Sequence, residues 1–223
     1  MRWILLAGLL VGCSRRGLRT PGSLSALGGD AAQYDRDSTE APPPAAPASL
    51  SSSSARRSGD GQDIAEGAVS LLGKRELVVA SERYRYDCSG MVCAAYAAGG
   101  QALSGSSKSL YAAAKDSGVL HTDALPRPGD IAFFDNSYDR NRNGQRDDEL
   151  THVAVVESVA EDGTITLIHL GSGAVSRIQM NLLHPEDSAV NSYLRARADL
   201  DGGPRLTGEL WRGFASLWSL PEG

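Results

Sequence analysis

The sequence is poor in cysteine, histidine and aromatic residues, and it lacks a long apolar segment. Its 223 residues include only 3 Cys and 4 His, and aromatic side chains make up 6% of the chain. Three cysteines exclude a disulfide-rich scaffold, and their scattered positions suggest three separate roles. The apolar run at residues 3–11 is too short for a membrane-spanning helix, which takes about 20 apolar residues.

An excess of basic residues is also lacking. The chain has 22 Lys and Arg against 27 Asp and Glu, and from residue 61 onward the balance is 15 against 22, a net charge of −7. Neutralisation of phosphates by Lys and Arg supplies most of a protein's affinity for nucleic acid. A segment this acidic, without a basic run, excludes nucleic acid as the main partner.

Composition divides the chain into three parts. Residues 1–12 have the features of a signal peptide, with one Arg ahead of the apolar run. Residues 13–60 are rich in Ser, Ala, Pro and Gly and show no apolar periodicity. Such a segment buries too little apolar surface to offset its ordering entropy, which predicts a disordered tether. Residues 61–223 are long enough for one sizeable core and are predicted to form a single domain.

The signal segment ends at a cysteine. Leu10-Val11-Gly12-Cys13 resembles the lipobox of bacterial lipoproteins, in which the cysteine thiol receives a diacylglycerol. The resemblance implies an exported lipoprotein held on a membrane by acyl chains. Each methylene of such a chain that is buried in the membrane contributes about 0.8 kcal/mol to the binding free energy. Ser14 is not the Asp associated with inner-membrane retention, so the outer membrane, facing the periplasm, is the expected location. An ordinary signal peptide that contains a cysteine is the alternative.

Apolar periodicity changes from helical to strand-like near the middle of the predicted domain. Helices are expected from Asp63, which stands three residues before a Glu as in a capping box, from Cys88 to Gly99, and over residues 106–115. Strands are expected over residues 131–134, 153–156, 164–170 and 175–180, with a hairpin turn at Asp162-Gly163. Residues 206–220 fit either a strand or a helix. Helices followed by strands predict an α+β fold with an antiparallel sheet.

Cys88 is the candidate nucleophile, because it stands at a predicted helix start between the polar residues Asp87 and Ser89. The N–H groups and the dipole of a helix N-terminus favour a thiolate, as a neighbouring imidazolium does. The N–H groups near Cys88 and Ser89 are also placed to receive an oxyanion. The alternative is a small buried hydrophobic role for Cys88. Cys93 fits that role better, and about 140° of helix turn separates the two thiols, so they are not expected to pair.

Two histidines are candidates for the base that a thiol nucleophile needs. His152 begins an apolar strand after a polar loop, and His169 lies near the end of the next strand. Two histidines near one sheet end can form a pair in which one takes the proton and the other orients it. A single histidine in a strand is more often structural, and that interpretation is assigned to His121 and His184.

Three segments together resemble the signatures of the NlpC family of bacterial cell-wall cysteine peptidases. They are Asp87-Cys88-Ser89-Gly90, Pro128-Gly129-Asp130-Ile131-Ala132-Phe133-Phe134 and Thr151-His152-Val153-Ala154-Val155-Val156. Their order and spacing match the family over roughly residues 61–180. The resemblance implies a papain-like fold with N-terminal helices packed on an antiparallel sheet. It makes Cys88 the nucleophile, His152 the base and His169 the residue that orients the base.

The resemblance also implies a substrate and a reaction. Members hydrolyse peptide bonds in peptidoglycan stem peptides, commonly the D-γ-glutamyl bond to a diamino acid. This chain lacks the Tyr and the Trp-Gly-Gly segment that members carry ahead of the nucleophile, and Tyr84 is the residue that could replace that Tyr in the substrate cleft. The departure leaves open a Cys/His amidase or acyltransferase acting on another substrate, or a catalytically idle envelope lipoprotein that binds cell-wall peptide. Nothing in the sequence indicates an oligomeric state.

An insertion ahead of His152 resembles a calcium loop of the EF-hand type. Oxygen-bearing side chains occupy its first, third, fifth and ninth positions, a glycine is sixth, and the seventh residue offers its backbone carbonyl. The predicted ligands are Asp139, Asn141, Asn143, Gln145 and Asp147. Catalysis is expected to need no cofactor. A cation bound in this loop would be structural and would brace the strand that presents His152. The alternative is a solvated turn, because the twelfth position is Leu150 and three arginines lie within the segment.

Overall fold

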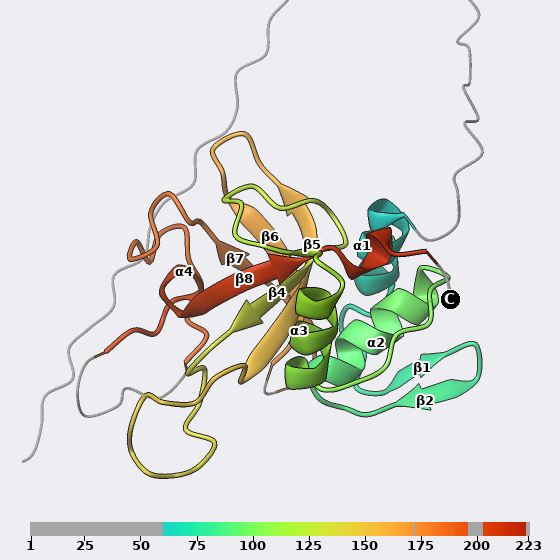
Figure 1. Ribbon diagram of the computed structural model, residues 1–223, viewed down its shortest axis with the longest axis horizontal. Coiled ribbons are helices and arrows are strands. Elements are labelled where there is room, and N and C mark those ends of the chain that lie inside the picture. The colour runs from blue at the N-terminus through green and yellow to red at the C-terminus, as the bar shows by residue number, and fades with distance from the viewer. Residues whose placement is uncertain (1–59, 172, 196–202, 222–223) are drawn as a thin grey trace, which may run out of the picture. The chain divides into compact units, whose positions relative to one another are not determined.

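The computed structural model describes residues 60–171, 173–195 and 203–221 (Figure 1). The predicted signal peptide, the predicted lipid-attachment residue Cys13 and nearly all of the predicted tether lie outside these residues. Within the described part, every helix is too short or too polar to cross a bilayer.

Six strands form one antiparallel sheet in the spatial order β3-β8-β4-β5-β6-β7. The strands are β3 (Leu120–His121), β4 (Ile131–Phe134), β5 (His152–Val159), β6 (Ile165–Leu170), β7 (Val175–Met180) and β8 (Trp211–Ala215). β8 lies between β3 and β4, so a segment from the end of the described chain completes the sheet (Figure 1). The four predicted strands are all present, and the hairpin turn between β5 and β6 has Gly163 at φ 82°.

Three helices come before most of the sheet: α1 (Gly61–Ser70), α2 (Cys88–Ala98) and α3 (Ser107–Asp116). α1 and α2 pack on each other and on β5. Ser106 caps α3, where its hydroxyl accepts the Ser109 N–H at 3.3 Å. This arrangement confirms the predicted α+β class, with helices packed on an antiparallel sheet.

The start of α1 differs from the prediction. The carboxylate of Asp60 accepts the N–H groups of Gln62 at 2.8 Å and Asp63 at 3.2 Å, so Asp60 is the N-cap. The capping role predicted for Asp63 is wrong. The apolar periodicity begins only at Ile64, and the first turn of the helix carries no apolar signal that would have placed it.

Apolar side chains fill both faces of the sheet, which explains why β4 is buried along its whole length. On the face covered by the helices, Ile131 and Phe133 join a core with Met91 and Val92 of α2. On the other face, Ala132, Phe134, Ala154, Val156, Ile165, Leu167, Met180, Leu210 and Phe214 form a second core. The second core includes Leu210 of the short helix α4 (Thr207–Leu210), which precedes β8.

Asp130, just ahead of β4, joins the end of the chain to the sheet. Its carboxylate is wholly buried and accepts the backbone N–H of Arg127 at 2.7 Å, the Ser216 hydroxyl at 2.7 Å and the Trp218 indole N–H at 2.9 Å. His121 Nε2 lies 3.3 Å from the second carboxylate oxygen. Ser216 and Trp218 belong to the segment after β8, around the 3-10 helix η1 (Leu217–Ser219). The carboxylate thus holds three separate segments of chain together.

A short hairpin precedes α2, formed by β1 (Leu77–Val79) and β2 (Glu82–Tyr84). Its two turn residues, Ala80 and Ser81, have φ values of 48° and 70°. Two-residue hairpin turns of this kind normally carry Asn-Gly or Asp-Gly. The hairpin was therefore not predicted, because Ala-Ser is not a turn signal.

Candidate active site

Cys88 is the first residue of α2, and the preceding residue caps the helix. Asp87 has extended backbone angles, and its carboxylate accepts the Gly90 N–H at 2.7 Å and the Ser89 hydroxyl at 2.9 Å. The Met91 N–H is bonded to the Asp87 carbonyl. Among the first N–H groups of the helix, those of Cys88 and Ser89 lie against the Cys88 thiol, where they lower its pKa by hydrogen bonding. These two groups are the ones placed to receive an oxyanion.

Gly90 allows the chain to pass closely over the start of this helix. A Cβ atom added at Gly90 would overlap the carbonyl group of Arg85. The Arg85 guanidinium returns to the same turn, donating from its terminal nitrogen to the Ser89 hydroxyl at 3.0 Å and lying 3.3 Å from the Asp87 carboxylate. The glycine of the Asp-Cys-Ser-Gly motif therefore serves packing, and the polar residues on both sides of Cys88 form one bonded network.

His152 and His169 are brought together by neighbouring strands of the sheet. His152 begins β5 and His169 lies in β6, and the distance between His152 Nε2 and His169 Nδ1 is 3.0 Å. The rings meet edge to face, with centroids 5.1 Å apart. Both side chains are buried. The hydrogen bond occupies Nε2 of His152 and leaves Nδ1 as the nitrogen available to a thiol.

The thiol and the histidine pair converge where α2 packs against β5. Burial raises the pKa of the Cys88 thiol, and the Val153 N–H, directly after His152, lies near enough to the sulfur to oppose that rise. Cys88 is partly buried against the helix-side core. The structure thus places the three sequence-predicted catalytic residues around the start of β5.

Burial favours the neutral form of all three groups. It raises the pKa of the Cys88 thiol, an effect that Asp87 reinforces and that the surrounding N–H groups oppose. Burial, followed by the neighbouring His169, lowers the pKa of His152 to about 3, and burial lowers the pKa of His169 to about 4. The expectation of a thiol acidified by an imidazolium does not hold for this ligand-free site, because desolvation outweighs the helix N-terminus. The resting pair is a thiol and a neutral imidazole.

These lowered pKa values predict that the fold loses stability in mild acid. The unfolded histidines take up protons near pH 6.5, whereas the folded ones resist protonation down to about pH 4 and about pH 3. The unfolded state therefore binds more protons in this window, and the free energy of unfolding falls as the pH drops from about 6.5 towards 4. Denaturant melts between pH 7 and pH 5 measure the slope.

The matched variants for that measurement are His169→Gln and His184→Gln. His184 is exposed, so its replacement should leave the slope unchanged, whereas His169→Gln should flatten it. Equal slopes in the wild type and in both variants would contradict the assignment of neutral buried histidines.

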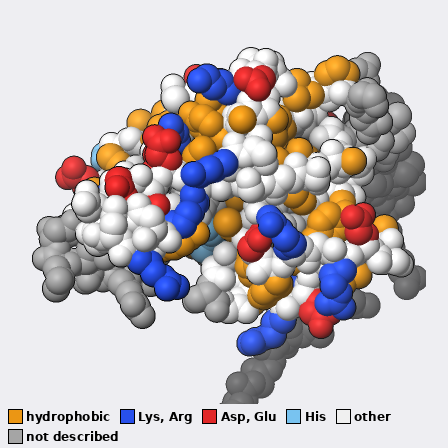
Figure 2. Space-filling view, turned by 60° about the horizontal axis from the view of Figure 1, so that its bottom comes forward, with side chains coloured by type: hydrophobic (Ala, Val, Ile, Leu, Met, Phe, Trp, Pro, Cys, Tyr) orange, Lys and Arg blue, Asp and Glu red, His pale blue; other side chains and the backbone are white. Residues whose placement is uncertain are grey.

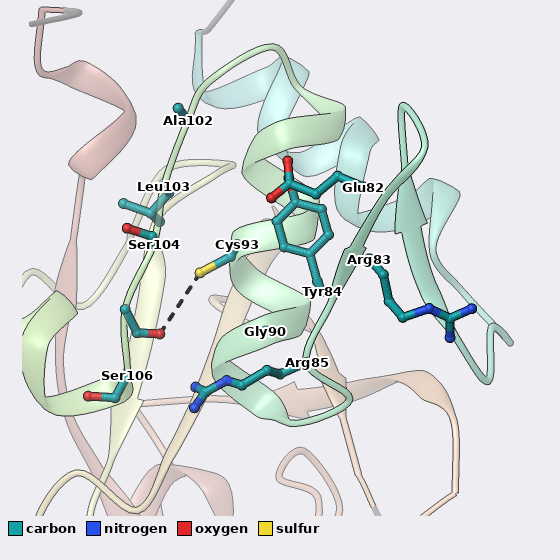
Figure 3. A pocket seen from close by; sticks show the side chains of 11 residues that line it. Glu82, Arg83, Tyr84, Arg85, Gly90, Cys93, Ala102, Leu103, Ser104 and Ser106 are labelled. Atoms are coloured by element: carbon teal, nitrogen blue, oxygen red, sulfur yellow. Dashed lines mark hydrogen bonds between the residues drawn. The ribbon is translucent and has the colours of Figure 1, made fainter.

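A pocket of about 620 Å³ runs beside α2. Figure 3 shows Tyr84 and Arg85 on one side of it and Ser104 and Ser106 on the other, with the Cys93 sulfur directed at the Gly105 carbonyl 4.0 Å away. The sequence-predicted cleft residue Tyr84 thus lines this pocket, and its hydroxyl donates to the Glu82 carboxylate at 3.2 Å. Arg85 connects the pocket with the nucleophile end of the helix through its contacts with Asp87 and Ser89.

The surroundings of Cys93 and His121 agree with the structural roles predicted for them. Cys93 is a free, buried thiol, and it does not pair with Cys88. His121 is bonded to Asp130 in the network described above.

Figure 2 shows Lys and Arg side chains gathered around a recess in which a histidine is visible. Acidic side chains lie on the same face, in keeping with the net negative charge of residues 61–223.

The predicted calcium ligands lie apart from these groups, in the loop between β4 and β5. Among the described residues, no three His, Cys, Asp or Glu side chains are grouped as a metal centre. A cation in the loop would therefore depend on its asparagines and backbone as well as on its two aspartates.

Comparison with known protein families finds a match over the region that carries the site. Residues 80–170 match the CHAP domain, a family whose members are typically cysteine- and histidine-dependent amidases or peptidases. The matched range contains Cys88, His152 and His169. The match supports the likeness to NlpC/P60-type cell-wall peptidases that the three sequence motifs indicate.

A solved structure is also similar, although at a low level. It is a protein from Staphylococcus aureus subsp. aureus Mu50 described as similar to a lipoprotein of the NLP/P60 family, with 17% identity and a TM-score of 0.36. The alignment covers 70% of this chain and 41% of that one, so this chain spans less than half of the solved protein. No curated protein matches the sequence.

Proposed function

We propose that this protein is a cell-wall hydrolase that cleaves amide bonds in peptidoglycan stem peptides, with Cys88 as the nucleophile. The observation that carries the proposal is the 3.0 Å hydrogen bond between His152 Nε2 and His169 Nδ1, beside a cysteine at a capped helix N-terminus. A base with a fixed ring orientation next to a thiol is the arrangement that acyl transfer needs.

The proposed mechanism requires one tautomer at the hydrogen bond between the histidines. In that tautomer His152 donates its Nε2 proton to Nδ1 of His169, which leaves His152 Nδ1 unprotonated. As the Cys88 sulfur attacks the amide carbon, its proton passes to that nitrogen, and the resulting imidazolium protonates the leaving amine. His169 is a positioning residue that fixes the ring. Water then attacks the thioester, again with His152 as the base, and releases the acid.

The neutral resting pair is compatible with this sequence. A thiolate is created only as substrate arrives, so charge develops where the N–H groups of Cys88 and Ser89 can stabilise the oxyanion on the carbonyl oxygen. Exclusion of water by the substrate strengthens those hydrogen bonds. Separating the charges in a buried site is unfavourable. The interactions made in the transition state compensate for it, so the free enzyme does not have to hold the separated charges.

The proposal also specifies which peptidoglycan bond is cleaved and where in the cell the protein is located. The D-γ-glutamyl bond to a diamino acid is the proposed target, supported by the three NlpC-like motifs. We place the protein in the cell envelope as a lipoprotein acylated at Cys13, on the periplasmic side of the outer membrane, from its lipobox-like segment. The Lys and Arg side chains near the recess of Figure 2 suit a stem peptide that carries free carboxylates.

Digestion of purified peptidoglycan by the full-length chain, followed by mass analysis of the soluble fragments, tests the proposal. Cleavage at the proposed bond releases fragments with a new amino group on the diamino acid. Release of stem peptides from the sugar instead would assign an amidase, which the CHAP match also allows. A wild-type fragment profile identical to that of an enzyme-free digest would remove the hydrolase function.

A further inference from the structure

We propose that the loop of residues 139–147, between β4 and β5, is a calcium site that supports the strand carrying His152. The proposal is independent of the reaction assigned to Cys88. It rests on one buried carboxylate oxygen of Asp139 that has no hydrogen-bond partner among the described residues. It also rests on two aspartates for which the described residues supply no ion-pair partner.

Asp139 presents its two carboxylate oxygens to different surroundings. Oδ2 accepts the Gly144 N–H at 2.9 Å, and Gly144 makes the required sharp turn at φ 76°. Oδ1 is buried and has no hydrogen-bond partner. A buried polar atom without a partner is costly, and a cation bound to this oxygen would remove that cost. One oxygen held by the glycine and one left free is the arrangement expected of the first ligand in a calcium loop.

The other side-chain oxygens of the loop keep capacity for a cation. Asn141 Oδ1 accepts the Asn143 N–H at 3.0 Å, and Asn143 Oδ1 accepts the Gln145 N–H at 2.8 Å. Each amide oxygen has two acceptor sites, so one remains on each. The amide nitrogens of Asn141 and Asn143 donate to the two oxygens of Asp147 at 3.0 and 2.9 Å. These bonds hold Asp147 close to the two asparagines that precede it in the proposed ligand set.

The loop contains two aspartates and three arginines, a formal charge of +1, so a cation site depends on whether the arginines lie against the aspartates. Within the described ranges, neither Asp139 nor Asp147 lies within ion-pair distance of a Lys, Arg or His. Arg140 donates instead to the carbonyls of Glu149 at 3.2 Å and Leu150 at 2.8 Å, and Arg146 donates to the Pro204 carbonyl. Two carboxylates in one short loop, neither in an ion pair with a described residue, favour a divalent cation.

Calcium suits this ligand set better than magnesium does. The proposed ligands are all oxygens, they include a backbone carbonyl, and most of them are exposed. Mg²⁺, in contrast, requires a near-ideal octahedron and dehydrates reluctantly. The position that normally supplies a bidentate Glu is Leu150, which removes one strong ligand. We therefore expect a dissociation constant of about 10⁻⁴–10⁻³ M, the range of extracellular modules.

The loop is connected to the catalytic histidine through a short bonded path. Arg140 N–H donates to Asp148 at 2.7 Å, and the Leu150 N–H donates to Asp135 at 2.7 Å. Thr151, the next residue, donates its N–H to the Phe134 carbonyl at 2.9 Å and accepts the Ser137 N–H at 2.8 Å. His152 follows directly. A cation that orders residues 139–147 thus stabilises the start of β5.

The test is a calorimetric melt of the full-length chain in chelator, in calcium chloride and in magnesium chloride. At about 100 times the dissociation constant, one bound ion should raise the Tm by about 5–10 °C for a domain of this size. Magnesium should raise it by less than half as much. Titration calorimetry with calcium alone should show one site in the same concentration range.

Two variants of equal charge change make the result specific. Asp139→Asn should remove most of the calcium shift, because it lowers the charge of the first ligand. Asp116→Asn, an exposed residue at the end of α3, should keep the full shift. The absence of any shift in the wild type, or equal shifts in both variants, would overturn the proposal.

Discussion

Replacement of Cys88 by Ala is expected to lower the rate of amide cleavage by about 10⁶-fold, to the limit of detection, because removal of a nucleophile takes away the covalent step itself. The fold should survive, since the side chain is partly exposed and lies at the edge of the core. Cleavage of purified peptidoglycan, measured as soluble fragments per unit time, gives the rate. Circular dichroism and Tm establish that the variant is folded.

Cys93→Ala is the matched control, because it removes the other described thiol from the same helix. The Cys93 sulfur faces the Gly105 carbonyl rather than β5, so this variant should cleave within a few-fold of the wild-type rate. If Cys88→Ala released the same fragments at a comparable rate, Cys88 would have no nucleophilic role. Loss of activity in both variants would instead indicate a structural effect along α2.

The largest effect on stability is expected from Asp130→Ala. The wholly buried carboxylate accepts hydrogen bonds from Arg127, Ser216 and Trp218. Its removal leaves these donors buried without an acceptor, together with a cavity, and breaking such a buried network costs about 3–5 kcal/mol. Urea denaturation at pH 7 should show this loss in the free energy of unfolding.

Asp123→Ala provides the comparison for that experiment. The Asp123 carboxylate also lies near His121, at 3.4 Å, but it is 81% exposed, so its removal should cost less than about 0.5 kcal/mol. Similar losses in the two variants would show that burial of the Asp130 network contributes little. At low temperature the folded Asp130→Ala protein should retain activity, because Asp130 and His152 lie at opposite ends of the β4–β5 pairing.

The sequence predicted those parts of the fold that rest on local signals. β4 and β7 have the expected bounds, and α2 begins at Cys88 as the polar flank of that residue indicated. The pairing of β8 between β3 and β4 was not predictable, because it joins segments about 80 residues apart and no periodicity encodes a partner. The β1–β2 hairpin lacks a turn signal, and the start of α1 lacks an apolar one.

In the candidate site, too, the sequence predicted what local signals encode and missed what depends on tertiary packing. The motifs and the alternation of strand residues placed Cys88, His152 and His169 near one another. They carried no information about desolvation, which depends on the packing of α2 against β5 and which raises the pKa of the thiol instead of lowering it. Arg85, which bridges Asp87 and Ser89, was missed because an arginine three residues before the nucleophile is not part of any motif.

The position of β8 has a consequence for how this chain is made. The sheet cannot close until residues 211–215 are available to pair with β3 and β4, and Asp130 remains without two of its donors until residues 216–218 follow. Closure of the sheet is therefore delayed until residues 211–218 are available, since the contacts that close it are long-range. Any truncation before Trp211 would leave β4 with an open edge.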